Sequence, residues 1–242
     1  MWRWCVYCST MYYMADLYHA LTRGVDKREI FKDKFDYLRF IHDLYEFNDV
    51  ESVGTSHRIF EKAKQTSGEG HIVIDERHSR ELLVHIHAFC LMPNHYHLLL
   101  SPAIEGGIPK FMKKLNMGYS RYFNERYERK GTLFEGKYKS ILVTAHAHFV
   151  HLPYYIHLNP LDMFDYGWRE RAVHNHADAM KYLEGYRWSS HLDYMGKKNF
   201  PSVTQRGFLL EFFGGREGYA QALGQWVEDI SIGEIQDVLL EK

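Results

Sequence analysis

The alternation of apolar and polar residues predicts four strands that form one antiparallel sheet. Residues 17–22 alternate in the way that a half-buried strand does. Residues 82–92 and 95–101 are apolar stretches on either side of Pro93-Asn94, and two strands joined by so tight a turn form a β-hairpin. Residues 137–143 read as the last strand.

Three helices are predicted between these strands. Residues 33–47 carry apolar side chains at helical spacing. A second, amphipathic helix starts near Pro109, a residue suited to the first helical turn, and runs to about residue 129. A third covers residues 145–158, with Thr144 as a candidate cap, and ends at Asn159-Pro160. The order strand, helix, hairpin, helix, strand, helix predicts an α+β fold with helices packed on one face of the sheet.

The remaining segments set the expected domain boundaries. Residues 1–15 form an N-terminal extension to a main domain at residues 16–165. Within that domain, residues 49–81 are polar and without clear periodicity, which indicates an exposed insertion. Residues 166–242 form a C-terminal tail, mostly helical after a connecting stretch.

Composition is that of a soluble globular chain of 242 residues, with 45% hydrophobic and 25% charged residues. The N-terminus lacks the apolar core of a signal peptide, and no apolar run is long enough to span a membrane. Cys5 and Cys8 form a lone C-x-x-C, and Cys90 is the only other cysteine, so a disulfide framework is not expected. We therefore expect a cytoplasmic protein without a membrane partner.

Local charge points more clearly to a partner than the net charge of −1 does. Between Lys110 and Lys139 there are nine Lys or Arg residues and three Glu, a local charge of +6. A basic segment in a neutral chain is typical of a surface that contacts phosphates. On charge alone, a solvated helix face explains it equally well.

Three histidine groupings are candidate metal ligands, namely His85/His87, His95/His97 and His146/His148/His151. Residues i and i+2 of a strand point to the same face, so an H-x-H pair can bind one metal ion from one side. For His85/His87, two half-buried sheet histidines are the more ordinary interpretation. His95/His97 directly follow the Pro-Asn turn, which would place a metal at the accessible end of the sheet.

The helix predicted at residues 145–158 supplies a second chemical element. Tyr155 and Asn159 are four residues apart, so both can lie on one face of the helix. A phenolate can attack phosphorus, and an amide oxygen is a hard ligand that suits magnesium or manganese beside two imidazoles. Tyr154 is the rival nucleophile, but it points about 100° away from Tyr155 on an ideal helix.

These residues stand in segments that resemble the HUH single-tyrosine transposases, the insertion-sequence-200-like family, and its REP-associated tyrosine transposase branch. Residues 91–99, LMPNHYHLL, are similar to the histidine–hydrophobic–histidine signature, and residues 155–160, YIHLNP, to the catalytic-tyrosine segment. Further similarity lies at the first strand (Tyr18-His19 to Arg23-Gly24, then Ile30-Phe31), at residues 131–140 and at the tail segment YRWSS, residues 186–190. The resemblance covers roughly residues 17–195 in the family's order.

The resemblance implies a ferredoxin/RRM-like HUH endonuclease palm and a DNA transposase or nickase. It implies that His95, His97 and Asn159 bind Mg²⁺ or Mn²⁺, and that Tyr155 cleaves and rejoins single-stranded DNA through a covalent 5′-phosphotyrosine. The DNA would be a hairpin of the REP kind. Candidate DNA contacts are basic residues of the charged segment: Arg121, Arg126, Arg129, Lys130, Lys137 and Lys139.

Two other functions stay open at this point. One is a domesticated protein that binds hairpin DNA without cutting it, and the other is a metallohydrolase that uses the histidines alone. The assembly is also open, since relatives of this fold work as homodimers with shared active sites, while the REP-associated branch is compatible with a monomer.

Overall fold

The computed structural model describes residues 16–51, 80–144, 146–164, 168–169, 173, 175–229 and 240. The expected N-terminal extension and most of the expected insertion at residues 49–81 lie outside these ranges. None of the helices in the described part is long and apolar enough to cross a membrane.

The predicted α+β architecture is confirmed by a four-stranded antiparallel sheet with strand order β2-β3-β1-β4. The two hairpin strands run on either side of Pro93-Asn94, as predicted, and β1 pairs with both β3 and β4. The strands are β1 (Tyr18–Arg23), β2 (Val84–Met92), β3 (His95–Pro102) and β4 (Lys139–Leu142).

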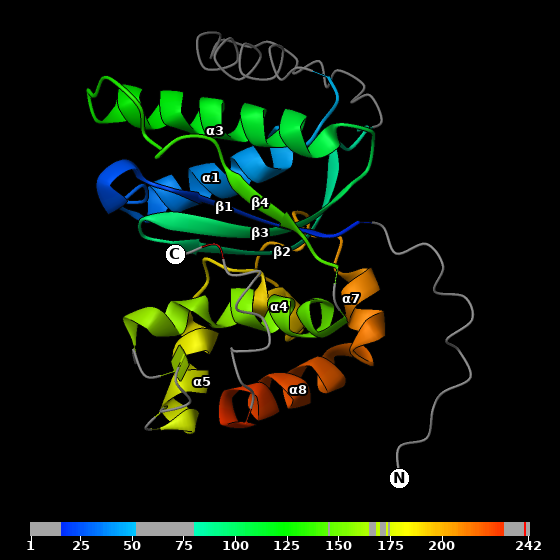
Figure 1. Ribbon diagram of the computed structural model, residues 1–242. Coiled ribbons are helices and arrows are strands. Elements are labelled where there is room, and N and C mark those ends of the chain that lie inside the picture. The colour runs from blue at the N-terminus through cyan, green and yellow to red at the C-terminus, as the bar shows by residue number, and fades with distance from the viewer. Residues whose placement is uncertain are drawn as a thin grey trace, which may run out of the picture.

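Two helices cover one face of the sheet, α1 (Lys34–Glu46) and α3 (Gly107–Arg126) (Figure 1). Helix α1 begins where the Asp33 carboxylate accepts hydrogen bonds from the backbone of its first turn, an N-cap. The apolar sides of both helices meet Phe89 and other residues of the sheet in one core cluster. Burial of these apolar side chains is the main force that holds this layer together.

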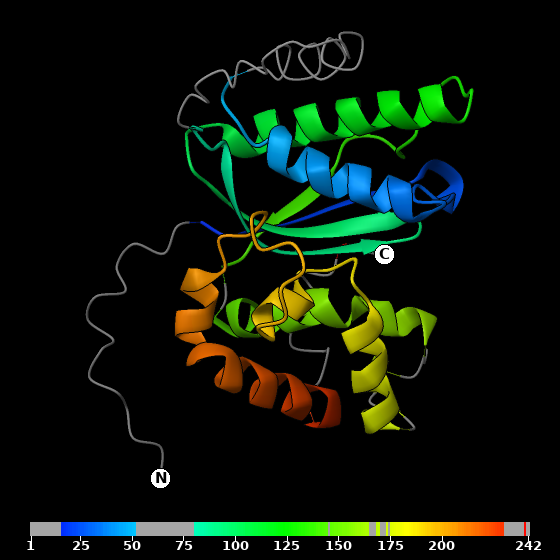
Figure 2. The same cartoon turned by 180° about the vertical axis from the view of Figure 1, so that it is seen from behind.

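The opposite face is covered by helices from residue 146 onward (Figure 2), so helices lie on both faces of the sheet and not on one face as predicted, because α4 packs against the C-terminal helices. Nearest to the sheet lies α4, which is apolar on all sides because it is enclosed between the sheet and the C-terminal helices in a second core cluster. The elements are α4 (His146–Leu158), the 3-10 turn η3 (Asn159–Met163), α5 (His176–Gly185), α6 (His191–Tyr194), α7 (Gly207–Phe212) and α8 (Gly215–Asp229). A 3-10 turn η2 (Val25–Lys27) follows β1.

The tail segment at residues 186–190 runs along the outer strand of the sheet. Ser189 forms a bridge with Cys90, and the Ser190 backbone amide donates to the Phe89 carbonyl at 3.0 Å. The Leu91 amide donates to the Trp188 carbonyl at 2.9 Å. These bonds satisfy backbone groups that the edge strand β2 would otherwise expose. The tail segment is therefore hydrogen-bonded to the edge of the sheet.

Candidate functional site

The three residues after the hairpin turn point to alternate faces of the sheet, as strand geometry requires. Tyr96 packs against Phe40 of α1 on one face, and its hydroxyl donates to Asn116 of α3. His95 and His97 lie on the face that carries α4, with ring centroids 5.0 Å apart. Tyr96 therefore belongs to the core between the sheet and α1, whereas His95 and His97 lie side by side on the other face.

Each of the two histidines has a hydrogen-bond partner at Nδ1. The Asn94 side-chain oxygen lies 2.6 Å from Nδ1 of His95, and His19 Nε2 lies 2.9 Å from Nδ1 of His97. His19 is placed there by the register of the sheet, because it pairs with Leu99 and is thus a diagonal neighbour of His97 on the same face. Partners of this kind fix the tautomer and the ring orientation of a metal-binding histidine and direct Nε2 to the ion.

Helix α4 brings Tyr155 to the histidines. The Tyr155 ring lies 6.0 Å from the His97 ring and 6.5 Å from the His19 ring, edge-on to both. One turn later, the Asn159 side-chain amide donates to the Tyr155 backbone carbonyl at 2.8 Å. The phenol therefore lies beside the histidines, but Asn159 is the first residue of η3 rather than part of the same helix as Tyr155.

Arg169 connects the phenol and the amide oxygen. Its Nη1 donates to the Tyr155 hydroxyl oxygen at 2.7 Å, and its Nη2 donates to Oδ1 of Asn159 at 3.1 Å. The Asp162 carboxylate holds the guanidinium through Nε at 2.8 Å and Nη2 at 2.6 Å, a bidentate ion pair. Trp168 also donates its indole N–H to Asp162. One guanidinium thus contacts two of the predicted site residues.

The site is closed. His97, Tyr155 and Asn159 are 0% exposed and His95 is 8% exposed, so the end of the sheet that carries the histidines is covered rather than accessible as expected. By contrast, the Arg169 side chain is 26% exposed. The α4 layer accounts for the difference from the sequence-based expectation, which considered the hairpin without its neighbours.

The donor set fits a divalent ion in part. Two imidazoles with hydrogen-bonded Nδ1 atoms are suitable ligands, whereas Oδ1 of Asn159 accepts a hydrogen bond from Arg169. The described residues contain no group of three or more His, Cys, Asp or Glu side chains arranged to bind a metal. In the other groupings, His87 bonds the Ser101 hydroxyl at 2.8 Å and His151 accepts from Trp226 at 3.1 Å. Neither contact suggests a ligand site.

The other sides of α4 face the C-terminal helices. Tyr154 packs against Phe213 and Tyr219, and burial raises the pKa of its phenol, which disfavours the phenolate that a nucleophile needs. His157 Nε2 lies 2.7 Å from the Ser190 hydroxyl, and its Nδ1 lies 2.8 Å from the Tyr219 hydroxyl. The Tyr219 hydroxyl also lies 3.0 Å from Nδ1 of His191. This buried chain fixes α4 against the tail.

Buried histidines predict a loss of stability in mild acid. Burial lowers the pKa of His87 and of His191 to about 4, from about 6.5 in an unfolded chain. Between these two values the unfolded chain binds more protons than the folded one, so stability falls as the pH decreases from about 6.5 to about 4. Each of the two groups accounts for roughly 3 kcal/mol over that range.

Urea unfolding between pH 8 and pH 4 measures this effect. We expect His191→Asn to reduce the dependence on pH, whereas His176→Asn, at an exposed histidine, leaves it unchanged. Equal unfolding midpoints at pH 7 and pH 4.5 would contradict the prediction.

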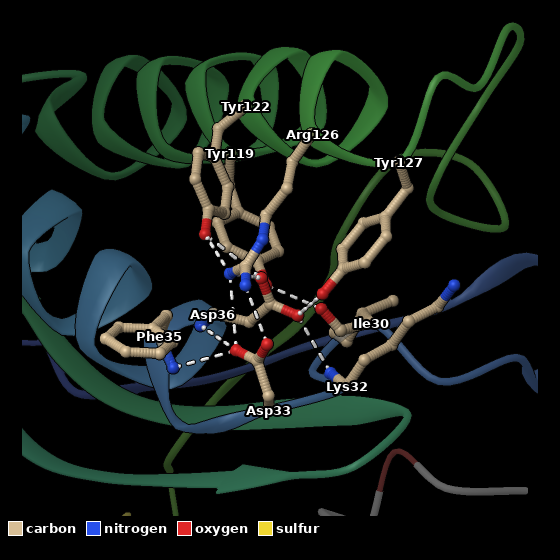
Figure 3. A network of polar contacts seen from close by, with 9 residues as sticks. All are labelled: Ile30, Lys32, Asp33, Phe35, Asp36, Tyr119, Tyr122, Arg126 and Tyr127. Atoms are coloured by element: carbon tan, nitrogen blue, oxygen red, sulfur yellow. Dashed lines mark hydrogen bonds and ion pairs between the residues drawn. The ribbon is translucent and has the colours of Figure 1, made fainter.

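Among the candidate DNA contacts, Arg126 stands apart because its guanidinium forms ion pairs with two aspartates of the same protein. It donates to Asp33 at 2.6 Å and to Asp36 at 2.8 Å, and Asp36 is fully buried (Figure 3). Tyr122 and Tyr127 also donate to Asp36, at 3.0 and 2.7 Å. This arrangement favours a structural role for Arg126, which joins α3 to the start of α1.

The other five candidate DNA contacts differ in their surroundings, and their contact with DNA stays a prediction. Arg121 forms an exposed ion pair with Glu125, and Arg129 donates to Asn124. Lys130 and Lys137 are exposed, and Lys139 donates to the Leu240 carbonyl at 3.5 Å.

One family of known proteins matches the part of the chain that contains the candidate site. Residues 57–159 match the family model described as "Transposase IS200 like", somewhat less than half of the chain, and the match contains His95, His97, Tyr155 and Asn159. No protein of curated function matches. A solved structure entitled "Structure of the REP associates tyrosine transposase bound to a REP hairpin" is similar over 84% of this chain and 90% of that one, with 11% identity and a TM-score of 0.39. A likeness this distant transfers neither a ligand nor a mechanism.

Proposed function

We propose that this chain, which carries an IS200-like transposase region at residues 57–159, is a nickase and strand transferase for single-stranded DNA. The observation that carries the proposal is the position of the Tyr155 phenol beside the ring of His97, with Asn159 four residues later at the start of η3. The family match supports the DNA substrate. The sequence resemblance to the REP-associated branch supports a hairpin as the form of DNA that is bound.

In the proposed reaction Tyr155 is the nucleophile. Its phenolic oxygen forms a bond to phosphorus and gives up its proton to water, while the bond from phosphorus to the 3′ oxygen breaks with its electron pair. The 3′ oxygen takes up a proton and leaves as a 3′-hydroxyl, and the 5′ end stays attached as a phosphotyrosine. A 3′-hydroxyl of another strand reverses these steps and joins the DNA without a high-energy cofactor.

His95, His97 and Asn159 would hold the divalent ion of this reaction. A bound Mg²⁺ or Mn²⁺ supplies positive charge that polarises the phosphate and makes phosphorus easier to attack. Asn94 and His19 orient the two imidazoles through Nδ1. For Oδ1 of Asn159 to serve as a ligand, its bond to Arg169 must be given up.

Because the phenol is 0% exposed, the structure represents a closed arrangement. A phosphodiester reaches Tyr155 only after the side chains that cover it separate. The Trp168 ring, 6.0 Å from the Tyr155 ring, is one of them. Closure of this kind also protects a reactive site from water when no DNA is bound.

A covalent adduct tests the proposal. The protein is incubated with a single-stranded hairpin oligonucleotide and Mn²⁺, and peptide mass spectrometry locates the attached nucleotide. We expect the adduct on Tyr155 and its absence when EDTA removes the metal. A hairpin-binding protein without cleavage activity would bind the oligonucleotide and form no adduct, and adduct-free cleavage would indicate a metallohydrolase.

A further inference from the structure

The contacts of Arg169 extend the proposed site. Among the described residues around Tyr155, His97 and Asn159 have no exposed surface, whereas the Arg169 side chain is 26% exposed. The Arg169 side chain therefore has some exposed surface while its Nη1 lies 2.7 Å from the phenol oxygen. An anion that approaches the phenol meets this guanidinium, whose charge Asp162 balances in the present arrangement.

The guanidinium is also held in a fixed orientation. Asp162 binds its Nε and Nη2 edge in a bidentate pair, which fixes the plane of the group. The Arg169 guanidinium carbon lies 4.9 Å from the Trp168 ring centroid and 5.2 Å from that of Tyr155, so the group is held between two aromatic rings. These contacts leave its Nη1 directed at the atom that reacts.

We propose that Arg169 is a further catalytic residue, which stabilises negative charge on the Tyr155 phenol oxygen and binds the phosphate that becomes attached to it. The inference rests on the proposed nickase function. In cleavage, the donated hydrogen bond favours the phenolate that attacks phosphorus. In rejoining, the 3′-hydroxyl oxygen attacks phosphorus, the bond to tyrosine breaks with its electron pair, and the charge returns to the phenol oxygen beside Arg169.

The test compares Arg169→Ala, Arg169→Lys and the wild type in single-turnover cleavage and rejoining of the hairpin oligonucleotide with Mn²⁺. We expect Arg169→Ala to slow both steps by about 100-fold or more, the usual effect of losing a donor to a developing oxyanion. Arg169→Lys keeps the charge and should retain part of the rate. Arg187→Ala is the matched control. The Arg187 guanidinium packs on Trp188 and Phe200, so the variant loses a comparable arginine–aromatic contact and should cleave DNA at the normal rate.

A structural role would give a different result. If Arg169 acts on the phenol oxygen, millimolar guanidinium should restore part of the cleavage rate of Arg169→Ala and leave the rate of the wild type unchanged. The melting temperature of Arg169→Ala should be the same with and without guanidinium. Unchanged rates in Arg169→Ala would overturn the inference and leave the nickase intact. Slow cleavage that guanidinium does not restore, with a lower melting temperature, would also overturn it. Absence of cleavage in both the wild type and Arg187→Ala would reject the nickase, and this inference with it.

Discussion

The Tyr155→Phe variant should lose DNA cleavage and the covalent adduct by roughly 10⁴-fold or more while it binds hairpin DNA as before, because removal of a nucleophile leaves no covalent route. Phenylalanine fills the same volume beside His97, so the fold is kept. The substitution removes the hydrogen bond from Arg169, and its loss should lower the stability by about 1–3 kcal/mol. Single-turnover cleavage and an electrophoretic binding assay measure the two properties separately.

Tyr154→Phe is the matched control on the same helix. The Tyr154 hydroxyl is buried and has no hydrogen-bond partner among the described residues, so its removal costs no contact and should leave cleavage unchanged. Stability should be equal to or slightly above that of the wild type, since a buried polar atom without a partner is unfavourable. Cleavage by Tyr155→Phe at the normal rate, or its loss in Tyr154→Phe, would show that the nucleophile is wrongly assigned.

Asp36→Ala should be the most destabilising substitution in the layer of α1 and α3. The Asp36 carboxylate is fully buried and accepts hydrogen bonds from Arg126, two tyrosines and the Lys32 backbone amide (Figure 3). Burial, followed by the bond to Asp36, raises the pKa of Tyr127, so this hydroxyl stays protonated and donates. Loss of the carboxylate leaves these donors without their acceptor, which costs about 3–5 kcal/mol when one partner of a buried pair is removed.

Urea unfolding followed by circular dichroism measures the change for Asp36→Ala. Glu125→Ala serves as the control, since it removes an acidic residue from the exposed Arg121 pair in the same layer and should leave the unfolding midpoint unchanged. Equal midpoints for Asp36→Ala and the wild type would refute the structural role given to Arg126 and its neighbours.

Elements with a strong local pattern could be predicted from the sequence. The pattern predicts the hairpin around Pro93-Asn94 and the helix that ends before Asn159 to within a residue or two, because strand alternation and turn residues are local signals. The side-by-side placement of His95 and His97 follows from the same alternation. The burial of this pair could not be predicted, since it depends on a helix that lies about fifty residues further along the chain.

Contacts between distant segments account for the other differences. Arg169 lies in a stretch that the sequence indicated only as a connection, and no pattern pairs it with Tyr155 or Asn159. His19 belongs to the first strand, and only the register of that strand against β3 brings it to His97. Arg126 looked like a phosphate contact because its neighbours are basic, but its acidic partner Asp36 is 90 residues away.

The late position of residues 186–190 in the chain has a consequence for biosynthesis. During translation β2 is complete almost a hundred residues before the segment that pairs with its edge leaves the ribosome. Until then the edge of the sheet has no cover, and the apolar surface of α4 waits still longer, for α7 and α8. This state favours binding to chaperones or to other nascent chains. A product truncated before Tyr186 therefore contains His95, His97 and Tyr155 but lacks the segment that closes the sheet and the helices that pack against α4.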